Sequence, residues 1–349
     1  MGDAPPARLT VERLFTTAGQ SVWDTVTWNR RDARIRDSHE RDVFFQSDVE
    51  APENWSEQAV RVAASKYFAG QLGGAEREDS VRQLIGRVVE TLRTWATESG
   101  LFADAGNVDA FCDELAFVLL HQMAAFNSPV WFNVGVDPKP QCSACFINSV
   151  DDSMESILDL AKTEAMLFKH GSGTGSNFSR LRGREETLSN GGTASGPVSF
   201  MRGFDAFAGV IKSGGRTRRA AKMVVLDADH PDIVEFVRSK AREEQKAWAL
   251  IDAGYDGSID GEAYGSVAFQ NANHSVRFPE DFWSAVRGDD EWQTRFRAQP
   301  GEGPRFPAQE LLLEVAQAAW LCGDPGVQYD DTIQRWHTCK NSGPINASN

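Results

Sequence analysis

Two cysteines separated by two residues, Cys142 and Cys145, are the side chains in this sequence best suited to redox chemistry. A glycine-rich run follows at 171–175, and a second run at 213–219 combines two glycines with three arginines. Glycines let a backbone approach a ligand closely, and arginine forks suit phosphates and base edges. Together the three segments indicate thiol redox chemistry on an anionic nucleotide.

Each segment also has a simpler interpretation. A Cys-x-x-Cys pair serves in zinc sites or consists of two unreactive thiols, although no second ligand pair with zinc spacing accompanies it here. The first glycine run follows a predicted helix instead of opening one after a strand, so a flexible turn is the alternative to a ligand loop. The arginine run is by default a solvated loop. The order of the motifs is what favours the functional interpretation.

The composition is that of a globular protein. Hydrophobic residues make up 41% and charged residues 25% of a 349-residue chain, which is long enough for one large domain or two ordinary ones. The net charge of -14 argues against a nucleic-acid partner. We find no apolar run of membrane-spanning length and too few cysteines for a secreted disulfide framework. We therefore expect a cytoplasmic protein with no membrane contact.

The pattern of apolar residues predicts helices first and an α/β region afterwards. Spacing of three and four residues predicts amphipathic helices over 56–70, 81–100 and 107–123. From about residue 140, predicted strands alternate with helices, and Asp152 is the expected cap of the first of these helices. The expected strands are 144–147, 177–181, 223–226, 247–251 and 267–271, and the expected helices begin near 197, 231 and 308.

The motifs, in this order, resemble the catalytic chain of ribonucleotide reductases. The resemblance is greatest to the class II, adenosylcobalamin-dependent branch, and it covers nearly the whole chain. Its most specific parts are Asn127–Asn133 and Gln141–Ile147. Val43–Gln46 and Ser65–Phe68 are matching pieces of the N-terminal region.

The resemblance implies an α/β fold in which a helical N-terminal domain precedes the first part of a ten-stranded α/β barrel. We expect an extended N-terminal arm over 1–55, the helical domain over 56–126 and the barrel segment over 127–349. Nucleotide reduction in this family uses a thiyl radical and a dithiol that becomes a disulfide. The cofactor implied is adenosylcobalamin, the substrate is a ribonucleotide, and the reductant is a thioredoxin-like or glutaredoxin-like protein.

The resemblance also assigns residues to the active site. Cys145, not Cys142, matches one member of the dithiol, and Asn349 matches a catalytic residue. The residues that match substrate contacts are Ser128, Ala144, Ser172 and Gly173.

A second nucleotide, a deoxynucleotide effector, is implied at the interface of a homodimer. Asp152 and Ser153 match one part of the effector site, and Lys169 and Arg182 match its basic contacts. The run at 213–219 matches the specificity loop between effector and substrate. Its matching residues are Gly214, Gly215, Arg216 and Arg218.

In the family, the segment that carries the radical cysteine follows the position of Asn349. We therefore expect this chain to be the N-terminal portion of the enzyme and to be inactive alone. Two competing hypotheses remain from the sequence. One is a non-catalytic nucleotide-binding or regulatory protein, and the other is a metal protein that uses Cys142 and Cys145.

Overall fold

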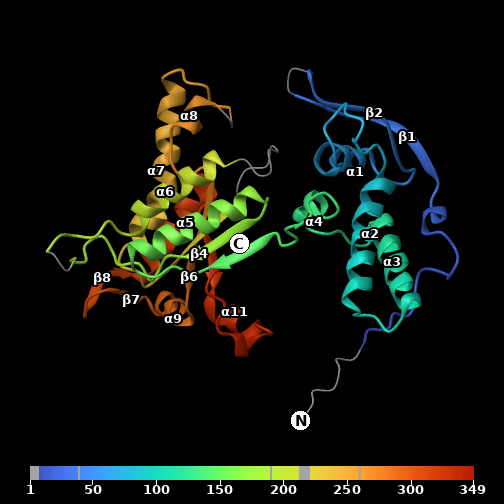
Figure 1. Ribbon diagram of the computed structural model, residues 1–349. Helices are drawn as coiled ribbons and strands as arrows, with labels where there is room; N and C mark the ends of the chain where they lie inside the picture. Colours follow the sequence, from blue (N-terminus) through green and yellow to red (C-terminus); the bar gives the residue numbers. More distant parts are fainter. Residues whose placement is uncertain (1–7, 38–39, 189–190, 212–220, 259–260) are drawn as a thin grey trace, which may run out of the picture. The chain divides into compact units, whose positions relative to one another are not determined.

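The computed structural model describes residues 8–37, 40–188, 191–211, 221–258 and 261–349. The chain divides into two compact units, residues 1–143 and residues 144–349 (Figure 1). Each unit has its own hydrophobic cluster. The three-part division at residues 55 and 126 stays a prediction.

The first unit combines an antiparallel ribbon with a helical layer. All three predicted helices are present, and part of the expected arm forms the ribbon, with Ala33 and Val49 fully buried. The elements are β1 (Trp28–Arg36), β2 (Asp42–Pro52), α1 (Glu57–Val62) with a π-helical turn at Ala63–Tyr67, α2 (Val81–Ser99), α3 (Ala105–Leu120) and α4 (Ser128–Asn133).

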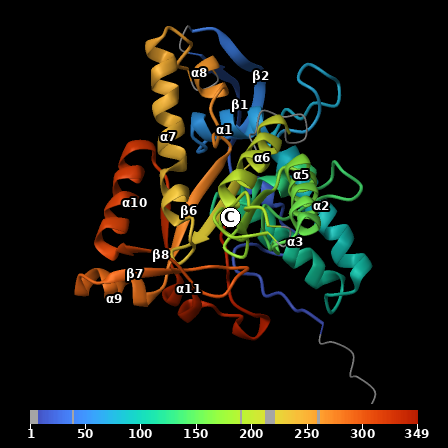
Figure 2. The ribbon, with the colours of Figure 1, turned by 90° about the vertical axis from the view of Figure 1, so that its left-hand side faces the viewer.

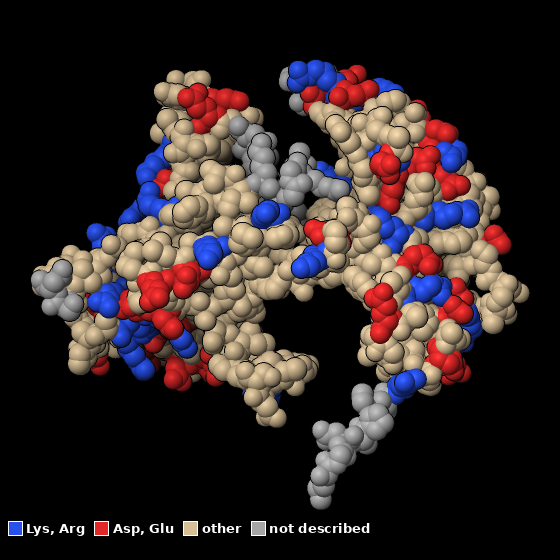
Figure 3. Space-filling view, in the orientation of Figure 1, with Lys and Arg blue, Asp and Glu red and all other residues tan. Residues whose placement is uncertain are grey.

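The helix α2 shows why this unit folds as the apolar pattern predicts. Ser80 caps its first turn by accepting a hydrogen bond from the Arg82 N–H, and Gly100 ends it in the left-handed conformation with φ of 60°. Its buried stripe, which includes Leu84 and Val88, belongs to the same core as α3. On the face seen in Figure 3, acidic and basic side chains are interspersed over this unit's surface.

The second unit is built on a parallel five-stranded sheet, which confirms the α/β fold class. The strand order is β3-β4-β5-β6-β9, and every neighbouring pair is parallel. The strands are β3 (Cys145–Asn148), β4 (Gly173–Asn177), β5 (Lys222–Asp227), β6 (Ala272–Phe278) and β9 (Gly326–Tyr329). The sheet is open, as expected of an incomplete barrel.

Helices connect the strands and bury one face of the sheet. Figure 2 shows α7 and α10 side by side along β6. None of the helices in the described ranges is long and apolar enough to cross a membrane. The helices are α5 (Met154–Lys169), α6 (Pro197–Val210), α7 (Ile233–Asp252), α8 (Glu262–Gly265), α9 (Glu280–Gly288), α10 (Ala308–Cys322) and α11 (Asp330–Trp336), with an antiparallel pair β7 (Glu291–Arg295) and β8 (Glu302–Pro307).

Several sequence-based element boundaries were wrong. Residues 173–175, expected as part of a glycine loop, belong to the buried strand β4, so the strand predicted at 177–181 begins four residues earlier and ends at Asn177. The strand predicted at 247–251 is the end of α7, because buried Phe236, Glu243 and Ala247 follow helical spacing. The strand predicted at 267–271 begins only at Ala272.

A buried histidine follows β5 and holds two loops together. His230 is fully buried, and its Nε2 lies 2.8 Å from the Leu181 carbonyl oxygen. Its Nδ1 accepts a hydrogen bond from the Asp232 N–H at 3.0 Å, so the neutral ring donates through Nε2. Burial lowers the pKa of His230 from 6.5 to about 4. Protonation would break the bond to Asp232, because Nδ1 would no longer accept.

We predict that His230 makes the protein acid-labile. Because its folded pKa lies below its unfolded pKa, the folded state binds fewer protons between about pH 6.5 and 4, and its stability falls as the pH drops through that window. The slope for one group is about 1.4 kcal/mol per pH unit. Urea unfolding at pH 6.5 and pH 5 should show about 2 kcal/mol less loss for His230→Gln than for the exposed-site control His170→Gln. Equal losses in the two variants would contradict the assignment.

Candidate active site

The two faces of the parallel sheet differ in chemistry. Side chains alternate along a strand, and residues in register on parallel neighbours share a face. The outer face carries buried apolar residues such as Val224 and Val276, whereas the inner face is mainly small and polar. Inner-face positions, by register from Cys145, are Cys145, Ile147, Gly173, Gly175, Asn177, Met223, Val225, Asp227, Asn273, Ser275, Arg277 and Gln328.

The segment 345–349 lies across this inner face. The Asn177 side chain donates to the Asn346 carbonyl oxygen at 3.0 Å, and the Gln328 amide donates to the Ser348 hydroxyl at 2.8 Å. Ala347, which lies between Asn346 and Ser348 in the sequence, is buried. The segment is therefore held by side chains from β4 and β9, and the C-terminus lies at the sheet in Figure 1.

Glycines on β4 make room for this segment. A Cβ atom at Gly173 would lie 2.9 Å from the side-chain oxygen and nitrogen of Asn349, and one at Gly175 would overlap the Ser348 carbonyl group. Gly173 is also the register partner of Cys145, and its N–H donates to the Ala144 carbonyl oxygen at 2.6 Å.

Four of the predicted active-site residues, Ala144, Cys145, Gly173 and Asn349, therefore lie together at the start of β3 and β4. Ser172, directly before β4, is buried beside them in the chain. Ser128 belongs to the first unit, where its hydroxyl lies 3.1 Å from that of Tyr67. Their roles stay predictions.

The cysteines differ in exposure. Cys145, at the beginning of the edge strand β3, and Cys339 are the two exposed thiols among the described residues. Burial raises the pKa of Cys142 and of Cys322, and it raises that of Cys112 to about 11. Because the thiolate is the reactive form, a raised pKa makes those thiols less reactive. No group of three or more metal-ligating side chains occurs in the described ranges, so the metal-site hypothesis gains no support there.

The predicted effector residues fall into two places. Arg182 Nε lies 2.6 Å from Asp152 Oδ2, and the Arg182 N–H donates to Asp152 Oδ1 at 3.2 Å. The prediction that Asp152 caps α5 is therefore wrong. The Ser153 hydroxyl caps it instead, by accepting from the Ser156 N–H at 3.2 Å, because the Asp152 carboxylate is engaged by a guanidinium group.

Lys169 lies at the opposite end of α5. The 16 residues of this helix span about 24 Å, so Lys169 does not meet Asp152 and Arg182 within one chain. The residues matched to the specificity loop, Gly214, Gly215, Arg216 and Arg218, lie outside the described residues.

A buried ion pair supports β4 and β5 from the outer face. Lys222 Nζ lies 2.5 Å from both carboxylate oxygens of Glu164, and the Ser176 hydroxyl donates to the same carboxylate at 3.0 Å. The two charged side chains are 0% and 2% exposed. Burial lowers the pKa of Lys222, and Glu164 acts in the opposite direction. Lys222 also lies over the rings of Phe178 and Phe204, which stabilises the cation further.

We predict that breaking this pair on one side strongly destabilises the second unit. Lys222→Met leaves Glu164 buried without its counter-charge, which costs about 3–5 kcal/mol. Urea unfolding should show that loss, and adding Glu164→Leu to Lys222→Met should restore most of it. The exposed-site control Arg305→Gln, which loses bridges to Glu291 and Glu302, should change stability by less than about 1 kcal/mol. No recovery in the double variant would rule out this explanation.

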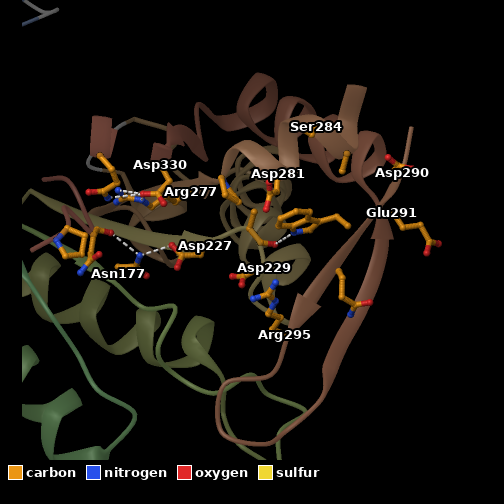
Figure 4. A pocket seen from close by; sticks show the side chains of 18 residues that line it. Asn177, Asp227, Asp229, Arg277, Asp281, Ser284, Asp290, Glu291, Arg295 and Asp330 are labelled. Atoms are coloured by element: carbon orange, nitrogen blue, oxygen red, sulfur yellow. Dashed lines mark hydrogen bonds and ion pairs between the residues drawn. The ribbon is translucent and has the colours of Figure 1, made fainter. Parts of the chain in front are cut away.

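A cavity that sequence reasoning missed lies where the strands β4, β5 and β6 end. Its volume is about 820 Å³, and Figure 4 shows Asn177 pointing toward Asp227, and Arg277 toward Asp330. Burial raises the pKa of Asp227. The only sequence signal for these residues is their position at strand ends. The predicted strands at 177–181 and 267–271 are shifted from β4 and β6, so those positions are not recognised in the sequence. Charged residues lining the cavity are Asp227, Asp229, Asp281, Asp290, Glu291, Asp330, Arg277 and Arg295.

The lining of this cavity does not fit a corrin cofactor. It is acidic, whereas large organic cofactors bind in mainly apolar pockets. Of the histidines in the described ranges, His230 and His274 are buried in the core. His170 and His337 lie at hydrogen-bonding distance from backbone carbonyls of their own segments.

Together, the open parallel sheet, the exposed cysteine at its edge and the segment threaded across its inner face define a part of an α/β barrel protein with a thiol site. Residues 143–349 match the model of the ribonucleotide reductase barrel domain, and residues 29–122 match that of class II vitamin B12-dependent ribonucleotide reductase. The chain belongs to the class II, vitamin B12-dependent ribonucleotide reductase family.

Three proteins similar to this chain are named vitamin B12-dependent reductases. The vitamin B12-dependent ribonucleotide reductase of Streptomyces clavuligerus is 53% identical over 98% of this chain and 36% of its own length. That of Rhodopirellula baltica is 50% identical over 95% of this chain and 35% of its own length. A vitamin B12-dependent ribonucleoside-diphosphate reductase of Thermoplasma acidophilum is 37% identical over 64% of this chain and 26% of its own length. The chain thus spans about a third of the length of the first two.

Proposed function

We propose that this chain forms part of an enzyme that reduces ribonucleotides to 2′-deoxyribonucleotides, supplying DNA synthesis. The observation that carries the proposal is the meeting of Cys145, Gly173 and Asn349 at one end of the sheet. Membership of a ribonucleotide reductase family supports it.

In this proposal Cys145 is one of two reducing thiols. The ribose 2′ C–O bond breaks, a C–H bond takes its place, and the oxygen leaves as water. The two electrons come from two thiols, which lose their protons and become a disulfide. The exposure of Cys145 suits it to exchange with a thioredoxin-like or glutaredoxin-like protein that restores the dithiol. The second thiol and the radical cysteine are proposed to lie outside this chain.

Asn349, Ala144, Ser128, Ser172 and Gly173 are proposed to position the substrate. The Asn349 amide offers two donors and an acceptor beside the strand pair that carries Cys145. We propose adenosylcobalamin as the cofactor, following the names of the relatives, and it would supply the radical.

We predict that Cys145 is essential for turnover and that Cys142 is not. In a full-length enzyme carrying this sequence, Cys145→Ser should abolish multiple-turnover reduction, because no disulfide can form at that position. The matched control Cys142→Ser should keep most of the activity, since the pKa of that thiol is raised by burial. Deoxynucleotide formation with an excess of dithiol measures both variants, and the reverse result would refute the assignment.

We further propose that Asp152, Ser153, Arg182 and Lys169 form a deoxynucleotide effector site in a homodimer. Lys169 lies at the other end of α5, so a single chain would not complete the site. Two α5 helices packed antiparallel would bring Lys169 of one chain to Asp152 of its partner. Exposed apolar side chains on α5, Leu158 at 60% and Met154 at 57%, suit such packing.

We predict that Arg182→Ala flattens the effect of deoxynucleotides on substrate choice. A hydrogen bond to a charged group contributes about 1.5–3 kcal/mol, so effector affinity should fall about ten- to a hundredfold. Arg180→Ala is the matched control, because the exposed Arg180 pairs with the neighbouring Asp151 instead. Effector titrations of product ratios in a full-length enzyme carrying this sequence test this, and equal responses from the two variants would contradict the placement.

A further inference from the structure

We propose that Arg277 is a positioning residue that clamps the segment 345–349 on the inner face of the sheet, and thereby fixes Asn349 beside Gly173. The clamp is a feature of the chain itself. Its consequence for turnover rests on the proposed function of Asn349.

Arg277 reaches the segment from the inside of the sheet. Its side chain is 4% exposed, and it lies on β6 with its guanidinium group directed at Asp330, as Figure 4 shows. Arg277 Nε donates to Asp330 Oδ1 at 2.7 Å, and Nη2 donates to the carbonyl oxygen of Ile345. A charged donor in a buried position makes a strong hydrogen bond to a carbonyl group. The carbonyl of Ile345 is therefore the main fixed point at the start of the segment.

Gln334 forms the second half of the clamp. Its side chain donates to the Ile345 carbonyl oxygen at 2.7 Å and accepts from the Ile345 N–H at 3.2 Å. It also donates to Asp330 Oδ1 at 3.0 Å, the atom that Arg277 binds. One carboxylate thus aligns both side chains that hold Ile345. The network links β6 and α11 to a single peptide unit.

The path from the clamp to Asn349 is short and guided. Three residues separate Ile345 from Asn349, and Asn177 and Gln328 bind the backbone of Asn346 and the hydroxyl group of Ser348. Beneath them the glycines of β4 let the backbone lie directly on the strand. A side chain at Gly175 would displace Ser348. A substitution there therefore tests how the segment 345–349 is placed near Asn349, whereas Arg277 acts near Ile345.

The clamp makes a distinct prediction for the conservative variant. A lysine at position 277 keeps the charge but has no fork, so it can hold Asp330 or Ile345 but not both with matched geometry. Arg277 Nη1 has no hydrogen-bond partner among the described residues, so Nε and Nη2 make the contacts of the clamp. Arg277→Lys should therefore fall between the native protein and Arg277→Gln.

Hydrogen–deuterium exchange of the segment 345–349 tests the clamp directly. Arg277→Gln, Gln334→Ala and Gly175→Ala should each accelerate amide exchange there at least tenfold, with Arg277→Lys intermediate. Arg287→Gln is the matched control, because Arg287 pairs with Glu280 on the exposed face of α9 and should leave exchange unchanged. Thermal unfolding of each variant shows whether the fold persists. Gln334 is half-buried, so its variant tests the clamp even where Arg277→Gln unfolds.

Turnover separates a positioning role from a merely structural one. In a full-length enzyme carrying this sequence, Arg277→Gln should lower kcat at least tenfold with KM within about twofold, and Arg277→Lys should recover part of kcat. Unchanged exchange in folded Arg277→Gln and Gln334→Ala would overturn the clamp. Faster exchange in these variants of a protein that reduces no ribonucleotide would leave the clamp standing and reject the proposed function instead.

Discussion

The inner face of β4 has no side chains at Gly173 and Gly175, and the candidate site depends on that gap. A strand normally keeps neighbouring backbone at a distance through its side chains. Here the segment 345–349 lies directly on the strand, and Asn349 meets the residue that faces Cys145 in the register. A larger residue at Gly175 would move the backbone of the segment outward, and one at Gly173 would displace the Asn349 side chain. The glycine run thus serves the chain's own backbone.

This thin inner face is possible because the outer face is packed and locked. Val224, Leu226 and Val276 are fully buried under the helices, and Lys222 with Glu164 ties β5 to α5. Replacing an ion pair of this kind by apolar residues is often harmless, so the charges are not required for stability alone. Through Lys222 and Ser176, the Glu164 carboxylate joins α5 to both β5 and β4.

The sequence predicted the elements that neighbouring residues specify, and it missed those that depend on residues far away in the sequence. Helices α2 and α3 follow from apolar periodicity, although α3 is capped by Asp104 and spans 105–120 instead of the predicted 107–123. The order of short motifs identified the family. The identity of β4 was missed because glycine is depleted in strands, and only contact with residues 170 positions later explains it. The site residues Cys145 and Asn349 came from resemblance. Arg277 carries no sequence signal, since its role depends on β6, α11 and the terminal segment together.

The helix α5 joins the two regions to which function is assigned. It begins beside the Asp152–Arg182 pair and ends in the turn that leads to Gly173, about 24 Å away. Glu164, two-thirds of the way along, is fixed by Lys222 and Ser176. The ion pair therefore fixes α5 against β5 at a point between these two regions.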